Sequence, residues 1–212
     1  MNLSTIFLPK REAFVDRLIR AANAERVVAS LPDKPRYWLA RRRTSGFGHV
    51  PHLLNPKQGD DYELVSSAMQ KCIFVHVPKT AGISVAHALF GSRAGGHLPL
   101  SYYLWLYGAQ KFDQYIKLAF VRHPIDRAQS AYQFLFQGGL SQVDRSWADL
   151  HVKPYKTFDD IVSKSLIRPE VHQGLHFRPQ VYFLIDPRTE KLGLDYLGTT
   201  ENIKQDFDVI AG

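Results

Sequence analysis

The segment Lys71–Leu89, KCIFVHVPKTAGISVAHAL, constrains the fold of this 212-residue chain more than any other. It begins with a short apolar, partly β-branched run, which is typical of a buried parallel strand. Pro78 ends the strand because it has no N–H to donate, and a helix is expected to begin near Ser84. Between them, Lys79 adds a positive charge and Gly82 lets backbone N–H groups approach a ligand closely. Since helix N-termini attract anions, the segment predicts a strand, a loop and a helix that together bind a phosphate-like group.

A second strand and helix of the same kind are expected within Tyr115–Gln137. The apolar run at 116–121 predicts a strand, Pro124 stands where a helix can start, and Gly138-Gly139 can end that helix. In open parallel sheets, ligands bind at the carboxyl ends of the strands. We therefore expect two neighbouring anion-binding loops.

The rest of the chain continues the alternation of strands and helices. We expect a helix from the N-cap Thr157 to Leu166, strands at Val181–Ile185 and Tyr196–Thr199, and a last helix at Glu201–Ile210. Such alternation predicts an α/β domain, over 71–212, whose parallel sheet is covered on both faces. Residues 1–70 are expected to form an N-terminal extension with an amphipathic helix at 10–30 and a loop at 44–60.

Composition narrows the partners and the compartment. The net charge of +7 and the pI near 9.5 favour anionic partners, either nucleic acid or a highly anionic small molecule or polysaccharide. No stretch approaches the roughly 20 apolar residues of a membrane span, and no secretory signal is evident. The single cysteine, Cys72, excludes an intramolecular disulfide. A cytoplasmic protein is expected, with peripheral membrane contact left open.

Two segments, HVPKTAGIS at 76–84 and FVRHPIDRAQSAY at 120–132, resemble the phosphate-binding elements of a known family. These are the sulfotransferases that use 3′-phosphoadenosine 5′-phosphosulfate (PAPS), in particular the carbohydrate-type branch with heparan sulfate 2-O-sulfotransferase and the chondroitin enzymes. HFRPQVYFL at 176–184 and TENIKQDFDVI at 200–210 are weaker likenesses to the same branch. The resemblance covers residues 71–210 and implies a P-loop-like three-layer sandwich with a central parallel sheet, to which the pattern of residues 1–70 adds the helical N-terminal extension.

The resemblance also implies roles for individual residues. Lys79 would stabilise the leaving phosphate, His97 would act as general base, Arg122 would bind the 3′-phosphate through its guanidinium fork, and Ser130 would meet the same phosphate. The residues expected to bind PAPS are Lys79, Thr80, Ala81, Gly82, Ile83, Ser84, Arg122 and Ser130. The product would be 3′-phosphoadenosine 5′-phosphate (PAP), and no metal is expected.

Simpler interpretations of these residues stay open. Lys79 could be an exposed turn lysine, Arg122 could form a structural ion pair with Asp126, Ser130 could be a packing residue, and His97 could merely cap a loop.

Other side chains have two interpretations as well. His76 is expected in the core rather than in catalysis. A metal pair of His172 and His176 is disfavoured by Gly174 between them, and Arg127 and Arg178 are candidate contacts to donor or acceptor. The aromatic side chains at 102–107 could stack on sugar rings or form a half-buried helix face.

The expected function is sulfuryl transfer from PAPS to a hydroxyl, with a carbohydrate as the expected acceptor and no nucleic acid as partner. A nucleotide-dependent phosphotransferase is the first alternative. It is disfavoured because the chain lacks a Walker loop and its second strand ends in Arg-His-Pro instead of a carboxylate for Mg²⁺. A non-catalytic basic module that binds anionic polymers is the second. Members of the branch usually continue past the last helix, whereas this chain ends at Gly212, so it is either a minimal or a truncated version.

Overall fold

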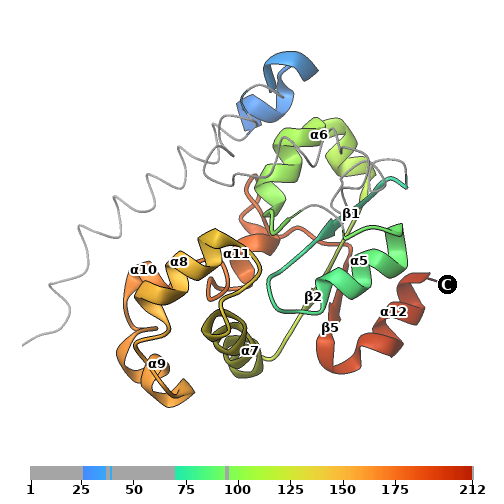
Figure 1. Cartoon of the computed structure of the whole chain (residues 1–212). Helices are drawn as coiled ribbons and strands as arrows, with labels where there is room; N and C mark the ends of the chain where they lie inside the picture. The colour runs from blue at the N-terminus through green and yellow to red at the C-terminus, as the bar shows by residue number, and fades with distance from the viewer. Residues whose placement is uncertain (1–25, 37–38, 40–69, 94–95, 212) are drawn as a thin grey trace, which may run out of the picture.

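The computed structural model describes residues 26–36, 39, 70–93 and 96–211, and the chain is mixed α/β (Figure 1). The elements that position the site are β1 (Cys72–Val75), α5 (Gly82–Phe90), α6 (Leu100–Gln114), β2 (Ile116–Val121) and α7 (Pro124–Phe136). They are followed by α8 (Gln142–His151), α9 (Phe158–Lys164), α10 (Pro169–His172), α11 (Val181–Leu184), β3 (Ile185–Asp186), β4 (Lys191–Leu192), β5 (Tyr196–Thr199), the 3-10 helix η2 (Thr200–Asn202) and α12 (Ile203–Ala211).

The main sheet has three parallel strands in the order β1-β2-β5. Val75 of β1 lies beside Ala119 of β2, and Val121 of β2 lies beside Thr199 of β5. Because all three strands run the same way, the loops after β1 and β2 leave the sheet at the same edge.

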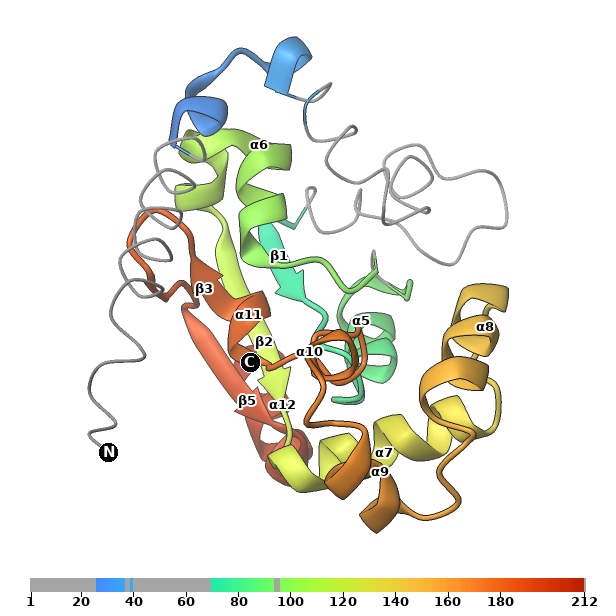
Figure 2. The ribbon, with the colours of Figure 1, turned by 90° about the vertical axis from the view of Figure 1, so that its left-hand side faces the viewer.

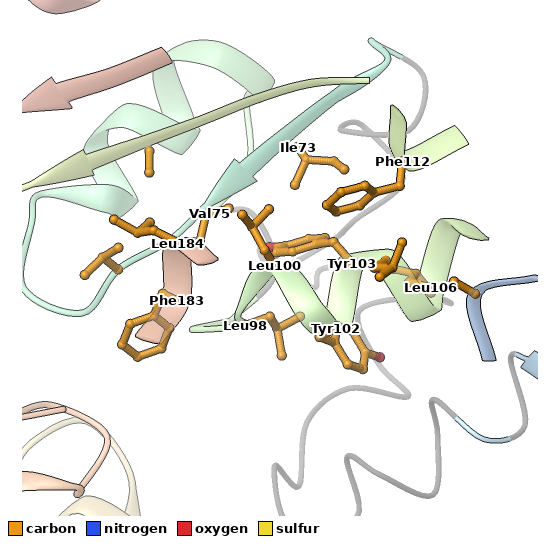
Figure 3. Packing of buried hydrophobic residues seen from close by; sticks show 14 residues of the cluster. Ile73, Val75, Leu98, Leu100, Tyr102, Tyr103, Leu106, Phe112, Phe183 and Leu184 are labelled. Atoms are coloured by element: carbon orange, nitrogen blue, oxygen red, sulfur yellow. The ribbon is translucent and has the colours of Figure 1, made fainter. Parts of the chain in front are cut away.

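Helices cover both faces of this sheet. Alternate side chains of β1 point to opposite faces, so Ile73 and Val75 pack with α6 and α11 (Figure 3), whereas Phe74 packs with α5 and α12. The hydroxyl of Tyr103, on α6, also donates to the Phe74 carbonyl at 3.1 Å. The expected parallel sheet with helices on both faces is confirmed.

A second cluster of apolar side chains joins α7 to α8, α9 and α10. Its buried members include Tyr132, Leu135, Ala148 and Ile161. Figure 2 shows α7, α8 and α9 beyond the ends of β1 and β2 that carry the arrowheads. This cluster therefore stands beside the carboxyl edge of the sheet, where the candidate site lies.

Most of the expected elements are present. The strand at 116–121, the helix from Pro124, the strand Tyr196–Thr199 and the final helix are confirmed, and the side chain of Thr157 accepts from Asp160 N–H as the N-cap of α9. Gly138 and Gly139 follow α7 with φ of 99° and 61°.

The strand expected at Val181–Ile185 is wrong. Val181–Leu184 forms the helical turn α11, and only Ile185 enters a strand, β3, which pairs antiparallel with β4 outside the main sheet. Val181 and Tyr182 are exposed while Phe183 and Leu184 are buried. That pattern fits one turn of helix, because a strand would alternate.

The described part of the predicted extension packs on the domain. Residues 26–30 and 33–36 are helical, whereas most of the helix expected at 10–30 and the loop at 44–60 lie outside the described residues. Ala29 joins the core with α6, and the buried Arg36 side chain donates to the carbonyls of Trp105 (2.7 Å) and Leu106. No helix in the described ranges is both long and apolar enough to cross a bilayer.

Candidate functional site

The loop between β1 and α5 has a backbone suited to an anion. Lys79 (φ 68°) and Ala81 (φ 59°) both adopt the left-handed conformation, which is costly for residues other than glycine. Ala81 is also the N-cap of α5 and provides no side-chain cap. Within the described chain, the N–H groups from Thr80 to Ile83 have no acceptor. Consecutive N–H groups in such a turn form a concave donor site for anions.

Contacts at Thr80 and at Gly82 fix the conformation of this loop. Thr80 is fully buried and its hydroxyl donates to the Val77 carbonyl at 3.0 Å, so its proton serves the loop and is not directed at the expected phosphate. A Cβ on Gly82 would lie 2.0 Å from Cδ2 of His76. Glycine is therefore needed here because the His76 ring occupies that space.

The other loop residues expected to bind PAPS lie at the surface. Ala81 and Ser84 are exposed, and Ile83 is 39% exposed. The Ser84 N–H donates to the Ala81 carbonyl at 3.0 Å in the first turn of α5, so this N–H is not available to a phosphate.

Lys79 is half-buried and turned toward the domain. Its Nζ lies 4.0 Å from the ring centroid of Phe134 on α7, which is a cation–π contact. Burial lowers the pKa of Lys79, the positive charge of Arg122 lowers it further, and the Asp144 carboxylate acts in the opposite direction. These contacts disagree with the interpretation of Lys79 as a solvent-exposed turn lysine.

Among the described residues, only one ring nitrogen of His97 has a hydrogen-bond partner. Its Nδ1 lies 2.9 Å from the His76 carbonyl, and because a carbonyl can only accept, Nδ1 carries the proton. The lone pair is then on Nε2, where a general base needs it. Burial lowers the pKa of His97 to about 4, with smaller contributions from His176 and Lys79, although the hydrogen bond to His76 opposes this shift.

His76 is buried next to His97, in agreement with the core position that the sequence predicts for it. It is 4% exposed, and its ring is 4.3 Å from that of His97 between centroids. Burial, followed by the charges of His97 and His176, holds the pKa of His76 well below 6.5. Its Nδ1 has no hydrogen-bond partner among the described residues.

His176 and Asp144 complete the cluster, and the sequence did not predict their pairing. Nε2 of His176 donates to Oδ1 of Asp144 at 3.2 Å, and its ring lies 5.9 Å from that of His97. Asp144 also forms a capping box with Ser141 at the start of α8. The hydrogen bond from His176 is the main cause that lowers the pKa of Asp144. In the sequence, the likeness of residues 176–184 to the carbohydrate-type branch is what indicates a role for this segment.

Arg122 lies at the end of β2, beside this cluster. Its backbone N–H donates to Oε1 of Gln180 at 3.0 Å and its carbonyl accepts from Nε2 at 2.9 Å. The expected structural alternative, an ion pair with Asp126, is absent, because Asp126 lies 3.8 Å from His123 instead. In the described part of the chain, no carboxylate forms an ion pair with the guanidinium of Arg122 or with the ammonium of Lys79, and the nearby Asp126 and Asp144 pair with histidines.

Ser130 and the two further arginines have different surroundings. Ser130 is half-buried on α7. Arg127 is buried and donates to backbone carbonyls, so it is not available as a contact to donor or acceptor. Arg178 lies 4.5 Å above the ring of Tyr182.

The aromatic side chains at 102–107 pack in or against the core, and His176 is the member of the considered metal pair that joins the site. Tyr102 and Tyr103 are buried in the core with Trp105 and Tyr107 packed against it, which confirms the half-buried helix face. Across the described ranges, no group of three or more His, Cys, Asp or Glu side chains is arranged to hold a metal ion. His176, one half of the metal pair considered from the sequence, is bonded to Asp144.

Comparison with protein-family models, with curated proteins and with solved structures found no match to this chain. The fold and the site define a mixed α/β protein in which two basic side chains and a histidine cluster gather at the carboxyl edge of a parallel sheet.

Proposed function

We propose that this chain transfers a sulfuryl group from PAPS to a hydroxyl, with a carbohydrate as the acceptor, and releases PAP. The observation that carries the proposal is the pairing of Lys79 and Arg122. They come from two neighbouring strand ends, the charge of Arg122 lowers the pKa of Lys79, and no described carboxylate forms an ion pair with either. Two such cations favour a ligand that brings negative charge to both, as a nucleoside with phosphates at two positions does.

The fold supports the same proposal at a coarser level. A parallel sheet with helices on both faces, and a strand-to-helix loop at its carboxyl edge, is what a P-loop-like domain requires. We include that fold class in the proposal.

The proposed reaction uses the side chains already described. The acceptor oxygen attacks sulfur, and its proton passes to Nε2 of His97. The bond between sulfur and the bridging oxygen breaks, and its electron pair leaves with the 5′-phosphate of PAP. Lys79 and the free N–H groups at the start of α5 stabilise that growing charge. The Thr80 hydroxyl shapes the loop, so Thr80 would meet the phosphate through its N–H group.

Calorimetry on the full chain tests this proposal. PAP should bind at least about tenfold more tightly than ATP with Mg²⁺, a difference of about 1.4 kcal/mol. Lys79→Ala should lower the turnover of PAPS by about 10²–10³-fold, as for the loss of a donor to a developing oxyanion. Lys156→Ala is the matched control, because Lys156 is an exposed lysine over the ring of Phe136.

Two results would favour the alternatives instead. Preference for ATP with Mg²⁺ over PAP would indicate a phosphotransferase. Binding of an anionic polysaccharide that Lys79→Ala leaves intact, without PAP binding, would indicate a non-catalytic module.

A further inference from the structure

The buried side chain of Arg127 binds backbone instead of an acid. It is 5% exposed, and within the described residues its guanidinium forms no ion pair. Nη1 donates to the carbonyls of Pro78 (3.4 Å) and His176 (3.0 Å). Nη2 donates to the carbonyls of Phe177 (3.2 Å) and Arg178 (2.8 Å). One planar fork thus joins α7 to two other segments, and a lysine, whose three donors share one nitrogen, could not reach all four carbonyls.

The first of these segments is the loop of Lys79. Pro78 directly precedes Lys79, which is held at a φ of 68°. A hydrogen bond to the Pro78 carbonyl restrains the peptide group that joins the two residues. Arg127 therefore acts on the backbone that aims the Lys79 side chain.

The second segment is the strap, residues 176–180. At one end of the strap, His176 is bonded to Asp144 and lies against His97. At its other end, the amide of Gln180 makes both hydrogen bonds to the backbone of Arg122. The strap thus contacts the proposed base and the proposed 3′-phosphate residue.

We propose that Arg127 is a positioning residue that fixes the Lys79 loop to the strap, and that Gln180 fixes the strap to Arg122. Neither side chain touches a reacting atom, and both act through residues that do. The inference rests on the proposed function, because it concerns how the same site holds PAP.

A double-mutant cycle on PAP affinity, measured by calorimetry on the full chain, tests this inference. Arg127→Lys keeps the charge but loses the fork, and it should weaken PAP binding by about tenfold or more. In a Lys79→Ala background the same change should cost measurably less, because the part of its effect that passes through the Lys79 loop is then absent.

Arg36→Lys is the control, since Arg36 is also buried and donates to two carbonyls, but on α6, and it differs from Arg127 in its ion pair with Asp33. It should lower the melting temperature and leave PAP affinity unchanged. If Arg127→Lys does not fold, Gln180→Met is the second variant. It should weaken PAP binding in the wild-type background and have no further effect in Arg122→Ala.

The outcomes separate the inference from the proposed function. Wild-type chain that fails to bind PAP overturns both. Wild-type chain that binds PAP, with a folded Arg127→Lys or Gln180→Met variant of unchanged affinity, overturns the positioning roles alone. Equal losses in both backgrounds of a cycle do the same.

Discussion

A single hydrogen bond decides what His97 can do. Because the His76 carbonyl accepts from Nδ1, the lone pair stays on Nε2. Burial lowers the pKa of His97 to about 4, so the ring is neutral, and able to take a proton, across the neutral pH range.

The pH dependence of kcat/KM should therefore fall on the acid side with a midpoint below 6.5, the ordinary pKa of histidine. His97→Gln should lower kcat/KM by about 10²-fold or more and remove that limb. The exposed His87, on α5, supplies the control His87→Gln, which should keep the wild-type profile. A midpoint above 6.5, or a limb that persists in His97→Gln, would count against His97 as the base.

At the residue scale, the sequence predicts the position of side chains that follow a strand. β1 and β2 lie where the sequence predicts them, so the loops that carry Lys79 and Arg122 leave the carboxyl ends of these strands. The partnership of His176 with Asp144 spans 32 residues, and no local pattern encodes it. The Thr80 hydroxyl was assigned to a phosphate because the sequence does not show that the Val77 carbonyl lies within reach.

Among the elements, α5 offers a paired test because it has a glycine at each end. Gly82→Ala would place a Cβ against the His76 ring, 2.0 Å from Cδ2, and should cost about 1–3 kcal/mol of unfolding free energy as overpacking. It should also weaken PAP binding, because the loop or the histidine must move. Urea unfolding and calorimetry on the same samples measure both effects.

Gly91→Ala is the control at the other end of α5. Gly91 has φ +69° and open space around a Cβ, so alanine should cost about 1–2 kcal/mol through the backbone alone. PAP affinity should not change in this variant. Should Gly82→Ala bind PAP as the wild type does, the loop at the start of α5 is not the phosphate site.

The error at Val181–Leu184 also belongs to this scale. A run of four apolar residues is too short for periodicity to separate a strand from a helical turn. Here the N–H groups of Tyr182 and Phe183 donate to the carbonyls of Pro179 and Gln180, which closes a turn. The strand at 116–121 is a longer apolar run, and the helix at 124–136 is long enough to show the helical period, so both are predicted correctly.

For the molecule as a whole, the buried histidines make stability depend on pH. Burial lowers the pKa of both His76 and His97 below 6.5, so the unfolded chain binds more protons than the folded one as pH falls below that value. The contribution of these two histidines to the free energy of unfolding should be fully present above about pH 6.5. It should decrease toward pH 4, by up to about 1.4 kcal/mol per pH unit for each histidine.

Thermal unfolding at steps between pH 7.5 and 4.5 measures this dependence, and His97→Gln should flatten it in part. The acids whose pKa values are lowered, such as Asp144, lose their contribution only at lower pH. A melting temperature that stays constant from pH 7 to 5 would contradict the burial of neutral histidines.

The central claim is that two strand ends of one sheet hold the two ends of one nucleotide. The most direct test compares the affinities of PAP and adenosine 5′-phosphate, which lacks the 3′-phosphate, for wild-type chain and Arg122→Ala. The account predicts that wild type prefers PAP by about tenfold or more, in line with a charge-assisted pair, and that Arg122→Ala loses this preference. Equal affinity of the wild type for both nucleotides would contradict it.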